Sequence, residues 1–523
     1  MRQAALVALA FLVLSCSHKK PAEPLAPPPT VNESITVTQQ SRLQRLTQGL
    51  ANIVASSSEQ PFVFDAAQHN TEEYGRFEEN PFLRPQDEPL STFSIDVDRA
   101  SYAHVRRFLQ SGQRPPRAAV RIEEMVNYFT YDYPQPDADP FSITTEVALC
   151  PWNPRHKLLS IGLQGKQLET RDLRPNNLVF LIDTSGSMES PDKLPLVKAG
   201  LKLLVEHLRP SDRVAIVTYA GSAGLVLPST KGIDRGKILT ALDQLEAGGS
   251  TAGAQGILLA YEVARQNFNQ RGNNRVILAT DGDFNVGVSS EDELQKLIEK
   301  ERGDGIFLTV LGFGTGNLKD SKMELLADKG NGNYSYIDTL AEARKTLVEE
   351  MGATLFTIAK DVKIQVEMNP AAVGAYRLIG YENRVLRDKD FNDDQKDAGE
   401  LGAGHSVTAL YEIAPPGTSL GAGVDALKYQ RRGRIAAGAE LATIKLRYKD
   451  PDSDTSRLLT RVVDADANRF MSENLRLASS VAELGMLLRE SEHRGRASFD
   501  AVLERARLHP EVTALARQAK RLF

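Results

Sequence analysis

Between residues 177 and 351 the sequence alternates short apolar runs with longer segments of helical periodicity, and this pattern constrains the fold more than any other feature. Strands are predicted at 178–182, 213–219, 275–280 and 306–311, and helices at 193–208, 235–245, 252–267, 291–300, 319–328 and 341–351. Alternation at these lengths is typical of an α/β fold with a doubly wound parallel sheet. Ligand sites in such sheets lie at the carboxyl ends of the strands.

Three loops at that edge carry hard oxygen ligands. The loop 183–187, with the sequence DTSGS, follows the first strand; the loop 248–251 (GGST) precedes a helix; and the loop 280–283 (TDGD) follows the third strand. Aspartate and serine also cap helices, and Ser187 or Ser190 could do so here. Carboxylates and hydroxyls from three loops can fill all but one position of an octahedron around Mg²⁺, which leaves that position for a water or a ligand carboxylate.

At these residues the chain resembles the von Willebrand factor type A domain and its metal-ion-dependent adhesion site. Asp183, Ser185 and Ser187 correspond to the DxSxS motif, Thr251 to the threonine of the second loop, and Asp281 to the aspartate of the third. The resemblance implies that the hydroxyls contact Mg²⁺ (or Mn²⁺ or Ca²⁺) directly, that the aspartates act largely through waters, and that an acidic side chain of a partner protein or peptide completes the coordination. It also implies that the closing helix near 341–351 shifts when ligand binds.

The chain is longer than a single hydrophobic core usually supports. The domain that resembles type A domains is predicted to span residues 175–353, and further domains are expected before and after it. Local periodicity predicts a small α/β N-terminal domain at 72–140, two strands within 141–170, a β-rich domain at 356–465 and a helical region at 466–523. Strand-like runs flank the predicted metal-binding domain on both sides. We therefore expect the two flanks to join in one β-sandwich, in which strands 142–148 and 361–367 lie in the same sheet and pack together.

Longer stretches extend the resemblance to bacterial type A domain lipoproteins of the YfbK-like group. They are ENPF at 79–82, PLSTFSIDVDRASY at 89–102, RIEEMVNYFTYDY at 121–133, CPWNP at 150–154 and TDGDFNVG at 280–287. This resemblance covers most of the chain. It implies architecture and location rather than a defined activity.

The first residues have the pattern of an export signal. Arg2 precedes an apolar run that is too short to span a bilayer, and Ser15-Cys16 ends it in a sequence that resembles a lipobox. Residues 1–15 are therefore predicted to be cleaved, Cys16 to carry a lipid, and 16–70, which is rich in proline, to form a tether. An ordinary signal peptide with an incidental cysteine is the alternative. The resemblance to sorted lipoproteins implies the envelope of a Gram-negative bacterium, at the outer membrane facing the periplasm.

Several functions lack support in the sequence. The formal net charge of −5 gives no basic field for nucleic acid. The histidines show no HExxH or paired-ligand spacing for a zinc hydrolase, and GFGTG at 312–316 lacks both the GxGxxG spacing and a P-loop lysine. We therefore expect a binding protein and no enzyme. Two rival hypotheses are an envelope scaffold whose metal only braces the loops, and a metal-assisted hydrolase.

Overall fold

A computed structural model describes residues 71–168, 173–250, 253–282, 291–350, 355–418 and 440–523. The predicted signal peptide, the lipidation position Cys16 and the tether lie outside these ranges. Within them, no helix has both the length and the apolar character needed to cross a bilayer.

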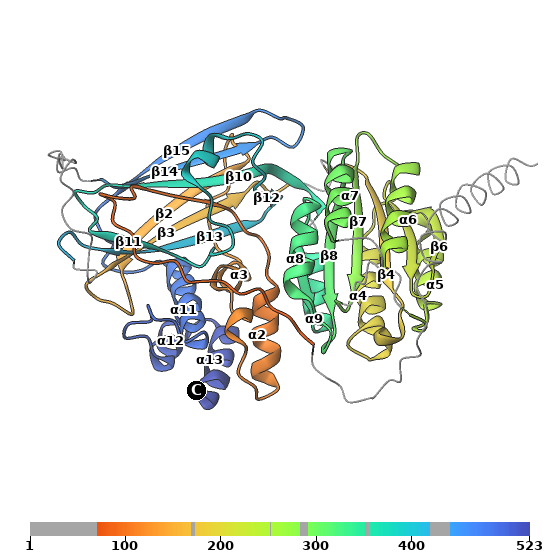
Figure 1. Cartoon of the computed structure of the whole chain (residues 1–523), viewed down its shortest axis with the longest axis horizontal. Coiled ribbons are helices and arrows are strands. Elements are labelled where there is room, and N and C mark those ends of the chain that lie inside the picture. Colours follow the sequence, from red (N-terminus) through yellow and green to blue (C-terminus); the bar gives the residue numbers. More distant parts are fainter. Residues whose placement is uncertain (1–70, 169–172, 251–252, 283–290, 351–354, 419–439) are drawn as a thin grey trace, which may run out of the picture. The chain divides into compact units, whose positions relative to one another are not determined.

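The central part of the chain forms a six-stranded sheet with helices on both faces (Figure 1). Its strands are β4 (Asn176–Asp183), β5 (Arg213–Tyr219), β6 (Ala223–Lys231), β7 (Asn273–Thr280), β8 (Ile306–Phe313) and β9 (Tyr334–Ile337). Their order is β6-β5-β4-β7-β8-β9, and every neighbouring pair is parallel except β5 with β6. The predicted doubly wound α/β sheet is confirmed, with the antiparallel edge strand β6 and the short strand β9 as additions.

The helices of this domain are α4 (Leu194–Glu206), α5 (Arg235–Asp243), α6 (Gly253–Gln266), α7 (Glu291–Gly303), α8 (Asp320–Lys329) and α9 (Leu340–Arg344). Successive residues of a strand point to opposite faces, so Leu178 and Phe180 share a core with α4, α5 and α9, whereas Val179 and Leu181 share one with α6, α7 and α8. The expected closing helix at 341–351 is divided: α9 ends at Arg344 and a π-helical turn (η4) follows over Lys345–Glu349.

The flanking strands form two antiparallel sheets. One has the order β1-β10-β14-β15, with β12 also paired to β10; the other has the order β11-β13-β3-β2. The bounds are β1 Leu90–Ser94, β10 Thr357–Met368, β12 Gly399–Gly402, β14 Glu440–Lys449 and β15 Ser456–Asp464 in the first sheet, and β2 Phe141–Leu149, β3 Lys157–Gly165, β11 Ala375–Ile379 and β13 Ser406–Ala414 in the second. Residues of both sheets share one hydrophobic core, and Phe141 of β2 lies edge-on against Tyr448 of β14.

The two flanks of the central α/β domain meet in this double-layered structure, but not through the strands that we expected. Strands 142–148 and 361–367 lie in separate sheets, so the expectation that they belong to the same sheet is wrong. The flanks are joined by β3 and β13, which pair along Lys157–Gln164 and Ser406–Ile413. The apolar periodicity of a strand predicts which face it buries, but contains no information about its neighbour in the sheet.

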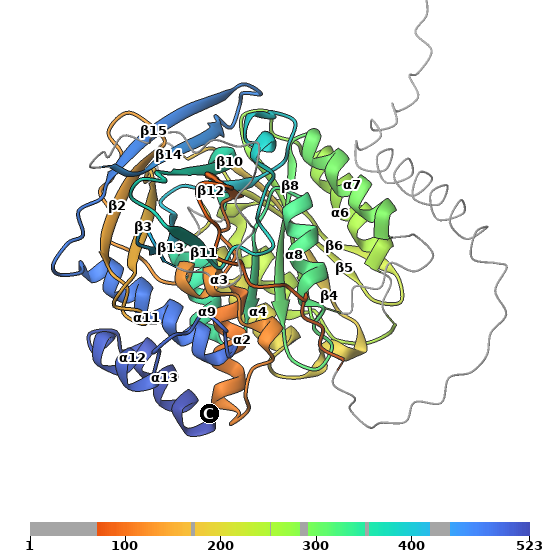
Figure 2. The ribbon, with the colours of Figure 1, turned by 60° about the vertical axis from the view of Figure 1, so that its left-hand side comes forward.

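The segment 72–140 does not form a separate domain. Its strand β1 pairs with β10, while α2 (Ala100–Gln110) and α3 (Ile122–Asn127) pack with the C-terminal helices (Figures 1 and 2). These are α11 (Glu473–Leu488), α12 (Phe499–Arg505) and α13 (Pro510–Leu522). Their apolar faces share a third core with Trp152, Leu158 and Leu410 of the β-structure.

Candidate metal site

Asp183 ends strand β4, and both of its carboxylate oxygens are held by neighbouring groups. The backbone N–H of Ser185 donates to Oδ1 at 2.9 Å. The hydroxyls of Tyr219 and Thr280 donate to Oδ2 at 3.0 and 3.2 Å. Tyr219 and Thr280 end the adjacent parallel strands β5 and β7, so the sheet edge itself orients the carboxylate.

The two serines of the DxSxS motif lie together on the turn that follows. Their hydroxyl oxygens, Ser185 Oγ and Ser187 Oγ, are 3.0 Å apart. The second predicted loop is bonded to this turn: Gly248 N donates to Thr184 O at 2.8 Å, and Gly186 N donates to Gly249 O at 3.0 Å. Thr251 lies outside the described residues, two positions after this junction.

Asp281 follows β7 and is fully buried. The ammonium group of Lys193, just before helix α4, lies 2.8 Å from its Oδ2 and is also buried. Gly282 comes next with φ of +101°, and a Cβ there would lie 2.7 Å from Lys319 N. The third loop can therefore turn at this point only with glycine.

Burial raises the pKa of Asp183 to about 6, and the charge of Asp281 adds to this effect. The hydrogen bonds from Ser185 and Tyr219 oppose it because they favour the ionised carboxylate. A divalent cation would act in the same direction as those hydrogen bonds. The carboxyl group thus lies where a bound cation would favour its charged form.

The residues present fit a small hard cation. Asp183, Ser185 and Ser187 offer oxygen atoms from one turn, and Asp281 offers another from the neighbouring strand end. Oxygen donors of this kind suit Mg²⁺, Mn²⁺ or Ca²⁺. The presence of Tyr219 and Lys193 at this site was not predicted from the sequence. Tyr219 could have been found, because it ends the strand next to β4 and is in register with Asp183. No sequence pattern indicated Lys193.

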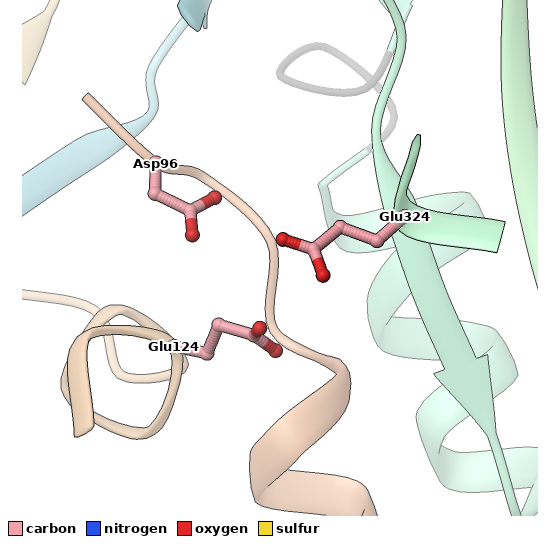
Figure 3. Close-up of side chains that lie close together, drawn as sticks. All are labelled: Asp96, Glu124 and Glu324. Carbon is pink, nitrogen blue, oxygen red and sulfur yellow. The ribbon is translucent and has the colours of Figure 1, made fainter. Parts of the chain in front are cut away.

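A second group of buried carboxylates lies away from this edge. Asp96 of the β1–α2 segment, Glu124 of α3 and Glu324 of α8 point toward one another (Figure 3), and their nearest oxygens lie within 4.8 Å of one another. All three side chains are buried. We call this group, with its charged neighbours below, the carboxylate junction, because it connects the central α/β domain to the flanking structure.

Two guanidinium groups already neutralise part of the carboxylate junction. Arg121 of the flanking structure contacts Glu324 at 3.1 Å and also bonds Glu124 and Asp320. Arg384, between β11 and β12, contacts four carboxylates: Asp96, Asp98, Glu324 and Asp328. The junction is therefore an ion-pair network rather than a metal site, with more acidic than basic groups among these residues.

The carboxylate junction makes stability depend on pH. Burial raises the pKa of Glu324 to about 8, with Glu124 and Asp328 adding to the rise and Arg121 and Arg384 opposing it. An unfolded glutamate titrates near about 4.3, so between about pH 4.3 and 8 the folded form retains a proton that the unfolded form has lost. Stability from this group is complete below the window and is lost as pH rises through it.

The variant Glu324→Gln is therefore expected to flatten the pH dependence of stability. The folding equilibrium constant would be measured by urea unfolding from pH 5 to 8.5. For each pH unit within the window, the constant of the wild type should fall by up to about tenfold more than that of the variant. Glu504→Gln, at an exposed position of α12, is the matched control and should follow the wild type. Parallel curves for wild type and Glu324→Gln would contradict the assignment.

Comparison with known proteins agrees with the fold. Residues 177–350 match the family described as von Willebrand factor type A domain, residues 68–160 match one described as von Willebrand factor, and residues 353–517 match "Uncharacterized protein YfbK, C-terminal". The sheet topology and the oxygen-lined edge thus define a protein with a type A domain.

The chain belongs to the YfbK family of proteins that carry this domain. It is 44% identical over 447 residues to uncharacterized protein YfbK of Escherichia coli (strain K12), with 83% of this chain and 77% of that protein covered. The inter-alpha-trypsin inhibitor heavy chain H3 of Pongo abelii is 29% identical over 262 residues, which is 46% of this chain and 29% of that protein. A solved structure, von Willebrand factor type A from Catenulispora acidiphila, has a TM-score of 0.42 and 16% identity over 75% of this chain and 91% of its own.

Proposed function

We propose that this protein captures a protein or peptide partner through a divalent cation at the carboxyl edge of its type A domain. Asp183, Ser185, Ser187, Thr251 and Asp281 would hold the ion, which supplies an electrophilic position for an acidic side chain of the partner. The observation that carries the proposal is the arrangement at Asp183: each carboxylate oxygen is fixed by a donor from the turn or from a neighbouring strand end.

The positions of the two serine hydroxyls support cation binding rather than simple helix capping. Ser185 is the N-cap residue of the short helix η2 (Gly186–Glu189), but its side chain makes no capping hydrogen bond to that helix. Instead, Ser185 Oγ lies next to Ser187 Oγ. The hydroxyls are therefore gathered at the sheet edge, where they can serve as ligands.

A groove beside the turn offers room for a partner. It has a volume of about 580 Å³, and its walls include Glu189, Lys198, Leu245 and Ala247. The groove lies between the start of α4 and the segment that leads to Gly248 and the second loop. A partner that places a carboxylate on the ion could thus also contact apolar and charged side chains next to it.

The proposal includes anchoring at the cell envelope through a lipid on Cys16. The supporting pattern is the short apolar run that ends in Ser15-Cys16, followed by the proline-rich residues to 70. A partner within the periplasm would be reachable from such a tether. Labelling with a radioactive fatty acid, with Cys16→Ala as control, would test the anchor, and equal labelling of both forms would refute it.

The variant Asp183→Ala is expected to lose partner capture while retaining its fold. The soluble chain that starts at Ser17 would be used as bait in envelope extracts, as wild type and as variant, each with Mg²⁺ or with EDTA, and bound proteins would be identified by mass spectrometry. We expect a partner on the Mg²⁺-loaded wild type alone, because the carboxylate that anchors the ion is missing from the variant.

Thermal melts of the same samples separate binding from bracing. A melting temperature of the wild type that differs little between Mg²⁺ and EDTA, together with selective capture, fits the proposal. A large drop in the melting temperature of the wild type when EDTA replaces Mg²⁺, without any Mg²⁺-dependent partner, would instead identify a structural metal, as in the scaffold hypothesis, and would refute the proposed function.

A further inference from the structure

A lysine is bound directly to one of the metal-site carboxylates. Lys193 Nζ lies 2.8 Å from Asp281 Oδ2, and the side chains are 9% and 0% exposed. Lysine is rarely buried to this degree unless it is paired. The pair therefore brings a fixed positive charge to one of the carboxylates proposed to hold the cation.

The local structure favours this pair over other positions of the lysine. Lys193 occupies the N-cap of α4 and makes no side-chain capping bond. A positive charge at the N-terminus of a helix is unfavourable because the helix dipole is positive there. The carboxylate of Asp281 offsets this cost, so contact with Asp281 explains why a lysine is tolerated at the cap.

The opposite side of the lysine is also specifically accommodated. Gly314, just after β8, has φ of +71°, and a Cβ at this position would lie 2.3 to 2.8 Å from the Cγ, Cδ and Cε atoms of Lys193. Glycine at this position thus leaves the space in which the aliphatic chain of the lysine lies. Asp281 and Gly314, which belong to two separate segments, thus border the ammonium group and the aliphatic chain of the lysine.

We infer that the ammonium group of Lys193 competes with the divalent cation for Asp281 and thereby sets the metal affinity of the site. This inference rests on the proposed function, since it concerns the same ion. With Lys193 in place, the formal charge of the two carboxylates and the lysine is −1 instead of −2. Loading then requires that the cation displace the ammonium group from Asp281 or share the carboxylate with it.

The consequence is a site that is loaded only when the free cation is abundant. Without the ion, Lys193 satisfies the buried carboxylate and keeps the third loop in place. With the ion bound, the ammonium group would give up Asp281 or share it with the ion, and Lys193, as the N-cap residue of α4, would couple this change to the start of that helix. Binding of the cation would therefore change the surroundings of α4, the helix that contributes Leu194 and Lys198 to the groove described above.

The test is titration with MnCl₂ by isothermal calorimetry, on the soluble chain from Ser17 as wild type, Lys193→Met and Lys193→Arg. Methionine keeps most of the apolar chain and removes the charge, whereas arginine keeps the charge. We expect Lys193→Met to bind Mn²⁺ at least about tenfold more tightly than the wild type, because a unit charge near the ion has been removed. Lys193→Arg should remain within about threefold of the wild type, since its charge is unchanged.

A variant pair in a second background distinguishes competition from a structural effect. In Asp281→Asn the lysine has no carboxylate for which to compete, so adding Lys193→Met should change Mn²⁺ affinity much less than it does in the wild type. Circular dichroism of each variant verifies folding. If Lys193→Met fails to fold, Lys193→Gln replaces it in both backgrounds.

The outcomes separate this inference from the proposed function. Binding of Mn²⁺ to Lys193→Met but not to the wild type would support the inference and refute metal-dependent capture by the natural chain. Equal or weaker binding by Lys193→Met would overturn the inference while leaving the proposed function intact. Absence of Mn²⁺ binding in every variant would overturn both.

Discussion

Replacing Arg384 with methionine is expected to lower the free energy of unfolding by about 3–5 kcal/mol at pH 7.5. The guanidinium group is 13% exposed and contacts four carboxylates, two of the β1–α2 segment and two of helix α8. Without it, Asp96 and Asp98 would face Glu324 and Asp328, and among the described residues the guanidinium still in contact with these four carboxylates would be Arg121, at Glu324. Breaking a buried ion pair on one side leaves charges that water cannot solvate, and this is why the cost is large.

Urea unfolding at two pH values would check this expectation. Part of the loss should be recovered at pH 5, because burial raises the pKa of Asp98 and of Asp328, and these carboxylates take up protons more readily in the folded form as the pH falls. Arg387→Met is the matched control: that arginine is exposed and pairs with Asp390 within its own turn, so its midpoint should equal that of the wild type. If both variants lost the same free energy of unfolding, the contacts of Arg384 with four carboxylates would contribute no more to stability than an exposed ion pair does.

The double variant Ser185→Ala, Ser187→Ala is expected to lower Mn²⁺ affinity by about a hundredfold or more. We expect this loss of affinity because the double variant lacks two hydroxyl ligands from one turn. Asp183 keeps its hydrogen-bond donors Tyr219 and Thr280, so the carboxylate itself stays in place. A loss of this size corresponds to about 2.7 kcal/mol, which is modest for two ligands of a hard cation. Calorimetric titration with MnCl₂ measures it directly.

Ser190→Ala is the matched control for this experiment. Ser190 lies three residues farther along the chain and its hydroxyl donates to Asp192, away from the pair Ser185 and Ser187. Its removal should leave Mn²⁺ affinity unchanged. If the double variant binds as tightly as this control, the hydroxyls are not ligands, and the turn would serve only to shape the backbone.

The parallel sheet could be predicted from the sequence because its strands are buried on both faces. Such strands are continuous apolar runs, and the run that ends at Asp183 is an example. The adjacent loops were also predictable, since the carboxyl ends of parallel strands meet at one edge. Edge strands are harder to detect: β6 is partly exposed and interrupted by Pro228, and β15 exposes Leu458 and Val462.

Contacts between distant segments could not be predicted in the same way. The pairing of β1 with β10 and of β3 with β13 joins residues separated by more than two hundred positions. The pair Lys193 and Asp281 is of the same kind, because a single lysine before a helix has no periodicity that distinguishes it. Helix α8 did contain a signal, with Asp320, Glu324 and Asp328 spaced four apart on one face, where solvent would be the usual neighbour.

The pairing of β3 with β13 has a consequence for how the molecule is assembled. Gly165, at the end of β3, lies so close to the start of β10 that an added Cβ would approach Ile358 to 3.0 Å. The type A domain thus leaves the sandwich and returns to it at neighbouring points, so for the sandwich it is a long surface loop. Since such a loop can grow or change with little cost to its host, the chemistry at the metal edge could diversify while the sandwich stayed the same. The arginines of the carboxylate junction are among the contacts that hold this loop against the rest of the molecule.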